Sequence, residues 1–296
     1  MDQSVRSNTY LWLGGSMYGE LHIWLIWSNL PLYSNLILNI RLKPLIFRVF
    51  NQMTDPIFPN FQKSRYLEVR HVGRFAQRLI YGNHTKEDLE NILSNCPNLQ
   101  DLATWSWPIK FLLPILNELT LKRLSADLSD ITRHDFLTST FANITHLEVV
   151  KFNGRSWEEW KVLLELPHLS HLIIGCVVDL DIFSNLLRYS SQPQLRILIF
   201  MPDYGYLVNL MPDGEWSNHK LLDIDDDRLV LVGSPRYPGL AEDWIKGGES
   251  GLNTWTFCEL VSLARKRKFI GPITMWFQCH ADLHATISHC RKILFG

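Results

Sequence analysis

Five stretches of this chain carry the same arrangement of apolar residues, and their spacing along the sequence is nearly constant. Each stretch has apolar residues at its first, fourth and sixth positions, with Thr104 and Ala126 as weaker sixth positions. The first positions are Leu99, Leu121, Ile144, Leu169 and Leu195, at steps of 22, 23, 25 and 26 residues. A pattern that keeps its phase in this way predicts a repeated unit stacked beside its neighbours.

Each unit is expected to consist of one strand and one helix. Pro97, Pro167 and Pro193 lie two residues before the first apolar position of three copies, where proline ends a helix and favours extended backbone. Apolar residues recur at helical spacing in 157–166 and 181–191, between the expected strands. We therefore predict an α/β fold, a leucine-rich-repeat-like solenoid with a parallel sheet on the concave face and helices on the outer face.

The pattern is less regular outside these copies. Weaker matches lie in 33–39, 64–70 and 227–233, at longer steps. The asparagine that usually follows the third apolar position in such repeats is replaced here. The equivalent positions hold Trp107, Ser129, Phe152, Val177 and Asp203. The turns must therefore be satisfied in another way, and an ordinary α/β domain with leucine-rich strands remains an alternative.

The overall composition excludes several classes of protein. Of 296 residues, 46% are apolar, so a large core can form, and the net charge of −1 lacks the basic excess of a nucleic-acid binder. The five cysteines show no regular spacing, which favours a reducing compartment, cytoplasmic or nuclear. Residues 10–27 are apolar, but Glu20, His22 and a Gly-Gly-Ser interrupt them, so neither a membrane span nor a signal peptide is expected.

These features divide the chain into three parts. We expect an atypical apolar N-terminal segment over 1–29, a repeat solenoid over 30–225, and a capping strand with helices over 226–296. Open solenoids need caps at their ends, and the last part is placed to be one.

Five segments together resemble a known family. They are LPLYSNLILN (30–39), ILSNCPNLQDLATW (92–105), LTLKRLSADL (119–128), WEEWKVLLELPHLSHL (157–172) and DDRLVLVGSPRYPGLAEDWIKGGESGLNTW (226–255). Their order and spacing resemble the F-box-associated leucine-rich-repeat proteins of basidiomycete fungi, over roughly residues 30–270. The resemblance implies a target-binding repeat domain that an F-box joins to the Skp-type adaptor of a ubiquitin ligase. The F-box itself would precede residue 30, and 1–29 do not show its pattern.

Alternate residues of the expected strands should form a polar row on the concave face. Apolar positions face the core and their neighbours in sequence face the other way. Because adjacent strands lie about 4.8 Å apart, equivalent residues of successive copies become lateral neighbours. We predict a protein-binding face formed by Asp101, Trp105, Arg123, Asp127, His146, Glu148 and His171. A solvated sheet face without a partner is the alternative interpretation.

The sequence gives little support for a catalytic site or a metal site. A metal or acid–base site at His146, Glu148 and His171 lacks an accompanying nucleophile. The CHADLH segment (279–284) has Ala where a zinc protease needs its general-base Glu. The acidic run 223–227 lacks the spacing of a calcium loop, and 246–251 lacks the end of a phosphate loop. We therefore expect no catalytic residue, metal or cofactor.

The basic run 265–268 has two interpretations. It is either a nuclear signal or the C-terminal end of a helix, where the helix dipole favours cations. The helix end is preferred.

The function predicted from the sequence is non-enzymatic. The chain is expected to be a protein-binding repeat domain whose target is unknown, and the family resemblance implies target recognition for an F-box-type ubiquitin ligase. A stand-alone leucine-rich-repeat scaffold without a ligase role is the alternative. Neither nucleic acid nor a membrane is an expected partner.

Overall fold

The structure is a computed structural model. In it the chain forms two compact units, Met1–Lys43 and Pro44–Gly296. The structure describes residues 12–15, 21–24, 45–49, 76–81, 86–154, 156–176, 178–190, 195–202, 224–232, 244, 253–270 and 275–276. In the first unit, β1 (Trp12–Gly15) pairs antiparallel with β2 (Leu21–Trp24). The part boundaries expected at residues 29/30 and 225/226 remain predictions.

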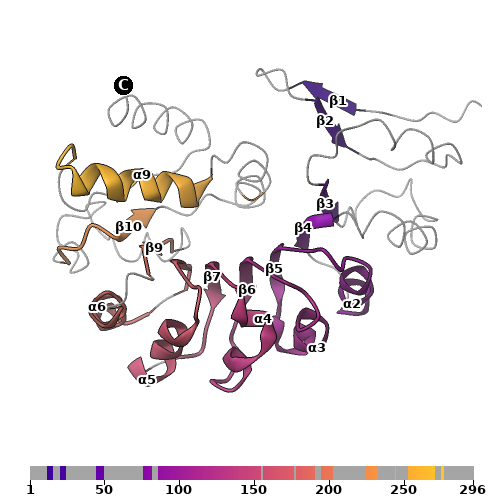
Figure 1. Ribbon diagram of the computed structural model, residues 1–296, viewed down its shortest axis with the longest axis horizontal. Coiled ribbons are helices and arrows are strands. Elements are labelled where there is room, and N and C mark those ends of the chain that lie inside the picture. Colours follow the sequence, from indigo (N-terminus) through magenta and orange to yellow (C-terminus); the bar gives the residue numbers. More distant parts are fainter. Residues whose placement is uncertain are drawn as a thin grey trace, which may run out of the picture. The chain divides into compact units, whose positions relative to one another are not determined.

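The second unit is built on one parallel sheet, whose strands lie beside one another in the order of the sequence (Figure 1). Its described strands are β3 (Leu45–Val49), β4 (Ala76–Tyr81), β5 (Asp101–Pro108), β6 (Arg123–Asp127), β7 (His146–Lys151), β8 (His171–Ile174), β9 (Ile197–Phe200), β10 (Leu229–Val232) and β11 (Met275–Trp276). This nine-stranded sheet is open, with β3 and β11 at its edges. The predicted α/β class with a parallel sheet is confirmed.

The five copies of the apolar pattern coincide with β5 to β9, and their phase is kept across the sheet. The second apolar positions pair in one continuous line: Leu102, Leu124, Leu147, Leu172 and Leu198. Leu229 of β10 continues the line beside Leu198, so the weaker match at 227–233 also forms a strand in register. The other weak matches, 33–39 and 64–70, lie outside the described residues.

Short helical segments connect these strands and lie on one side of the sheet (Figure 1). They are α2 (Lys86–Ser94), η3 (Ile109–Leu112), α3 (Leu113–Leu116), η4 (Asp135–Leu137), α4 (Ser139–Ala142), α5 (Trp157–Trp160), η5 (Lys161–Glu165) and α6 (Leu180–Tyr189). Phe141, Trp160 and Phe183 from these segments are fully buried in one core with the strand leucines. The repeated leucines therefore face the helices, and the alternate residues face the opposite side.

Helix α9 (Thr254–Lys266) packs on that opposite side of the sheet, where it forms a second apolar cluster (Figure 1). Asn253 caps its N-terminus, because the Asn253 side-chain oxygen accepts a hydrogen bond from the Thr256 N–H at 2.9 Å. The last turn of the helix carries Arg265 and Lys266. Within the described ranges, no helix is both long and apolar enough to cross a membrane.

Backbone hydrogen bonds repeat from strand to strand at the start of β6 to β9. Before each strand, one carbonyl accepts two N–H groups of the next copy: Lys122 O accepts from Thr145 and His146, and Thr145 O accepts from Ser170 and His171. After the strands, the side-chain amide of Asn153 donates to Ser129 O at 3.1 Å. This asparagine lies one residue beyond the usual position, so one turn is still held by an amide.

The leucine line sets the stability of the core, and two leucine substitutions test this. Leu147 is fully buried, whereas Leu137 on η4 is 68% exposed. We expect Leu147→Ala to lower the free energy of unfolding by about 2–5 kcal/mol, because it removes buried contacts and leaves a cavity. Leu137→Ala should change it by about 0.5 kcal/mol or less. Urea denaturation followed by circular dichroism measures both, and equal losses would contradict this packing.

Candidate protein-binding site

The polar row predicted from the sequence is present on the face opposite the strand leucines. Asp101 of β5 pairs with Arg123 of β6, Arg123 with His146 of β7, and His146 with His171 of β8. The guanidinium Nε of Arg123 lies 3.2 Å from Asp101 Oδ1, which makes an ion pair along the row. Four consecutive strands thus supply one line of acidic, basic and aromatic side chains.

The two histidines of the row form a stacked pair. Their ring centroids are 4.1 Å apart and the planes differ by 4°. Each ring is fixed by the hydroxyl that precedes it: Thr145 Oγ1 lies 2.8 Å from Nδ1 of His146, and Ser170 Oγ lies 2.8 Å from Nδ1 of His171. Burial, together with the charges of His171, Arg123 and Arg196, lowers the pKa of His146 to about 2. His146 is therefore neutral in this arrangement.

A second line of residues lies one step further along the strands. Ser125 pairs with Glu148, and the Trp105 indole donates to Ser125 Oγ at 2.7 Å. Glu148 is 3% exposed, and its Oε2 accepts a hydrogen bond from the Trp244 indole at 3.2 Å. Burial raises the pKa of the Glu148 carboxyl, although hydrogen bonds from Ser125 and Trp244 act against the rise.

The repeat predicts that equivalent residues of neighbouring strands lie side by side, and this pairing is lost after the third apolar position of β5 and β6. The pairing shifts after Thr104 and again after Ala126, so Asp127 lies opposite Lys151. Lys151 Nζ is 3.3 Å from Asp127 Oδ2, while Asp127 Oδ1 accepts the Ser129 N–H at 2.9 Å. Asp127 is buried, and its hydrogen bond with Ser129 stabilises the turn that follows β6. The prediction that Asp127 lies in a regular row beside Arg123 and His146 is therefore wrong.

Helix α9 covers the His171 end of the row. Nε2 of His171 lies 3.0 Å from Glu259 Oε1, and the Arg196 guanidinium lies 3.5 Å from the same oxygen. The hydrogen bond from His171, together with the charges of His171 and Arg196, lowers the pKa of Glu259. The Trp255 and His146 rings are nearly perpendicular, at 88°, with centroids 5.1 Å apart.

The expectation of an entirely open face is wrong for four predicted residues. Asp101 is 5% exposed, and Asp127, Glu148 and His171 are each 3% exposed. Trp244 lies against Glu148, and α9 lies against His171. Arg123 keeps a side chain that is 27% exposed, and Trp105 and His146 are partly exposed. The accessible residues of the predicted face are thus Trp105, Arg123 and His146.

Sequence reasoning missed four residues that complete this site. They are Arg196, Trp244, Trp255 and Glu259. The sequence of the strands did indicate a covering element, because Ile173, Ile197 and Ile199 occupy positions that were expected to face solvent. A run of β-branched apolar residues on such a face indicates that another element covers it.

The remaining candidates from the sequence are placed as follows. Among the described residues, no group of three or more His, Cys, Asp or Glu could hold a metal ion. Asp226 of the acidic run pairs with Arg228 at 2.7 Å. Arg265 is buried and donates to Leu229 O, so the basic run begins in the last turn of α9, and the helix-end interpretation is confirmed. The segments 246–251 and 279–284 lie outside the described residues.

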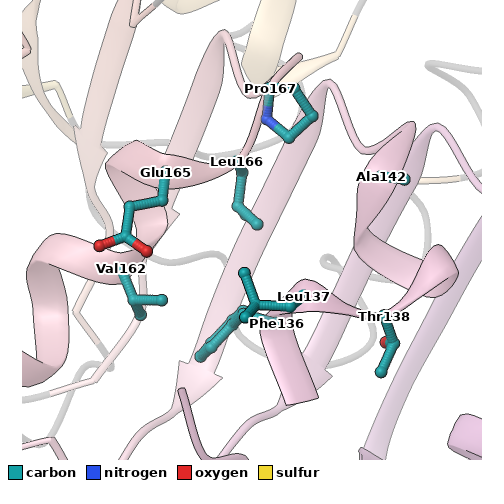
Figure 2. Close-up of a pocket in the computed structure, with 8 residues that line it drawn as sticks. All are labelled: Phe136, Leu137, Thr138, Ala142, Val162, Glu165, Leu166 and Pro167. Atoms are coloured by element: carbon teal, nitrogen blue, oxygen red, sulfur yellow. The ribbon is translucent and has the colours of Figure 1, made fainter. Parts of the chain in front are cut away.

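A cavity lies on the helical side of the sheet, away from the polar row. It has a volume of about 170 Å³ and is lined by Phe136, Leu137, Thr138, Ala142, Val162, Glu165, Leu166 and Pro167. Figure 2 shows the η4 side chains Phe136 and Leu137 across from Val162 and Leu166. Glu165 at its edge pairs with Arg133 at 2.7 Å. This apolar hollow has none of the row residues and no pair of groups arranged for acid–base chemistry.

No family model matches this chain, and a search of the curated proteins found no match. The family resemblance inferred from the sequence therefore stays a prediction.

The buried Glu148 carboxyl should make stability depend on pH in a defined direction. Its pKa is raised in the folded chain, so the folded state takes up the proton first and the wild type gains stability as pH falls toward the ordinary Glu value. Glu148→Gln, which stays neutral, should be at least as stable as the wild type near pH 8, and this advantage should shrink near pH 5. Urea denaturation across this range measures the difference.

The matched control for this prediction is Glu118→Gln, because Glu118 is exposed. Its stability difference from the wild type should be small and flat with pH. A Glu148→Gln variant whose stability difference is equally flat with pH would show that the pKa of this carboxyl is not raised in the folded chain.

Proposed function

We propose that this chain is a non-enzymatic protein-binding domain of leucine-rich-repeat type, and that the polar row through Arg123 is its binding surface. The observation that carries the proposal is the lateral alignment of Asp101, Arg123, His146 and His171 on four neighbouring strands. Strands that follow one another in order, each with a helical segment on the same side, support a solenoid of repeats.

The accessible side chains of the predicted face have the chemistry of a protein interface. Aromatic residues and arginine are enriched among the residues that dominate binding, and charged pairs at the rim fix orientation. Trp105 and Arg123 are partly exposed, and Arg123 is held in place by Asp101. The partner that fits is a protein segment with its own acidic and basic groups, since the row presents both charges.

The sequence resemblance gives this domain a place in a larger assembly. It supports target recognition for an F-box-type ubiquitin ligase, acting in the cytoplasm or nucleus, with a Skp-type adaptor as second partner. A stand-alone repeat scaffold is the second candidate.

Charge substitutions in the row test the binding role. Arg123→Glu should reduce recovery of specific cross-linked partners at least about tenfold, because it reverses a charge at the centre of the surface. Arg188→Glu on α6, an exposed arginine on the helical side, is the matched control and should retain them. Quantitative mass spectrometry after photo-cross-linking measures both.

The exchanged pair Asp101→Arg with Arg123→Asp separates folding from recognition. It keeps an ion pair at this position but reverses the order of charges, so we expect a folded chain that still loses the partners. Retention of the same partners by both row variants would contradict the proposal.

The ligase role and the scaffold role differ in one binding measurement. A ligase subunit should form a complex with purified Skp-type adaptor that elutes as one species in size-exclusion chromatography. A chain that is folded by circular dichroism and does not bind the adaptor would favour the scaffold.

A further inference from the structure

The predicted face contains both positive and negative groups, but they differ in how far they reach the surface. The side chain of Arg123 is 27% exposed, whereas that of Asp101 is 7% exposed and that of Asp127 is 5% exposed. The third carboxylate of the face, Glu148, is buried as well. Arg123 is therefore the charged residue of this face that a partner can contact most readily.

The guanidinium of Arg123 is held through its inner nitrogen. Nε lies 3.2 Å from Oδ1 of Asp101, the residue that pairs with Arg123 on the neighbouring strand β5. Among the described residues, the terminal nitrogens Nη1 and Nη2 form no hydrogen bond. These two nitrogens make up a planar fork that can donate two parallel hydrogen bonds to one carboxylate. Asp101 thus orients the guanidinium and leaves this fork open.

The accessible residues beside Arg123 add aromatic surface without adding a charge. His146 pairs with Arg123 on β7 and is neutral, because burial and the neighbouring positive charges lower its pKa to about 2. The indole of Trp105 donates to Ser125, which lies on the same face of β6 as Arg123, two residues further along. Because its N–H is engaged there, the exposed part of the Trp105 ring offers an apolar surface.

We propose that the predicted face recognises an acidic segment of its partner protein, and that Nη1 and Nη2 of Arg123 bind one carboxylate of that segment. An apolar side chain next to the carboxylate packs on the ring of Trp105. This inference rests on the proposed function and names the chemistry of the partner that the surface takes.

A carboxylate fits this position better than a phosphorylated side chain does. Phosphate groups carry up to about two negative charges and are typically bound by clusters of arginines. The nearby Arg196 is paired with Glu259 at 3.5 Å, and the charge of Arg123 is partly offset by Asp101. The open fork of Arg123 matches the single charge and the two oxygens of a carboxylate.

Fluorescence anisotropy with labelled peptides and the full chain tests this recognition. The probes are short peptides in which leucine alternates with glutamate, glutamine or lysine. We expect the glutamate peptide to bind at least about tenfold more tightly than the glutamine peptide, because it alone forms the charged, doubly hydrogen-bonded pair. The lysine peptide should bind no more tightly than the glutamine peptide. Equal binding of the glutamate and glutamine peptides would overturn the proposal.

A further peptide, in which phosphoserine replaces glutamate, compares the two anions. We expect its affinity to stay within about tenfold of that of the glutamate peptide, because the same fork can bind either group. A phosphoserine peptide that binds more tightly than this would assign the surface to phosphorylated partners and overturn the choice of a carboxylate.

Substitutions at Arg123 locate the binding. Arg123→Gln should abolish the preference for glutamate over glutamine, and Arg123→Lys, which keeps the charge and lacks the fork, should weaken glutamate binding at least about threefold. The matched control is Arg188→Gln, at an exposed arginine in the last turn of α6, and it should bind as the wild type does. A preference retained by Arg123→Gln would overturn the proposal, and full binding by Arg123→Lys would contradict the role of the fork.

Competition on the wild-type chain separates this inference from the proposed function and does not depend on the folding of a variant. Excess glutamate peptide, added before photo-cross-linking, should reduce recovery of the partners at least about tenfold, whereas the glutamine peptide should not. Partners that Arg123→Glu loses but the glutamate peptide does not displace would overturn acidic recognition and leave the binding surface in place. Partners that Arg123→Glu retains would contradict the binding surface itself.

Discussion

The pairing of one leucine with the next across parallel strands is the constraint on which the rest of this structure depends. Leu102, Leu124, Leu147, Leu172 and Leu198 form one line, buried against the helical segments. Because side chains alternate along a strand, this line also fixes which residues face away from the helices. A slip of one residue in any strand would exchange the two sets, so the core and the polar row are determined by one register.

The face opposite the leucines carries polar groups in places where apolar residues would be more stable. Glu148 is buried, and Arg265 of α9 is buried with two guanidinium nitrogens that have no hydrogen-bond partner among the described residues. Burial lowers the pKa of Arg265. Burying charged groups costs free energy unless they are paired.

The phase of the repeat could be predicted from the sequence because it depends on local spacing alone. Strands β5 to β9 and the line from Asp101 to His171 follow from it directly. Strands β3 and β4 do not carry that spacing and were missed. The burial of Glu148 and His171 depends on α9 and Trp244, about 90 residues later in the chain. Contacts of this kind leave only an indirect trace in sequence, here the isoleucines of β8 and β9.

Disulfide trapping between β6 and β7 tests the shared register most directly. Cysteines in place of Arg123 and His146 would lie at paired positions on one face, within the Cα separation of about 4.4–6.8 Å that a disulfide needs. Mild oxidation followed by peptide mapping should find this pair cross-linked. The shifted pair, Arg123→Cys with Leu147→Cys, should not cross-link, because Leu147 faces the helices. Efficient cross-linking of the shifted pair, and not of the first, would contradict the register and with it the polar row.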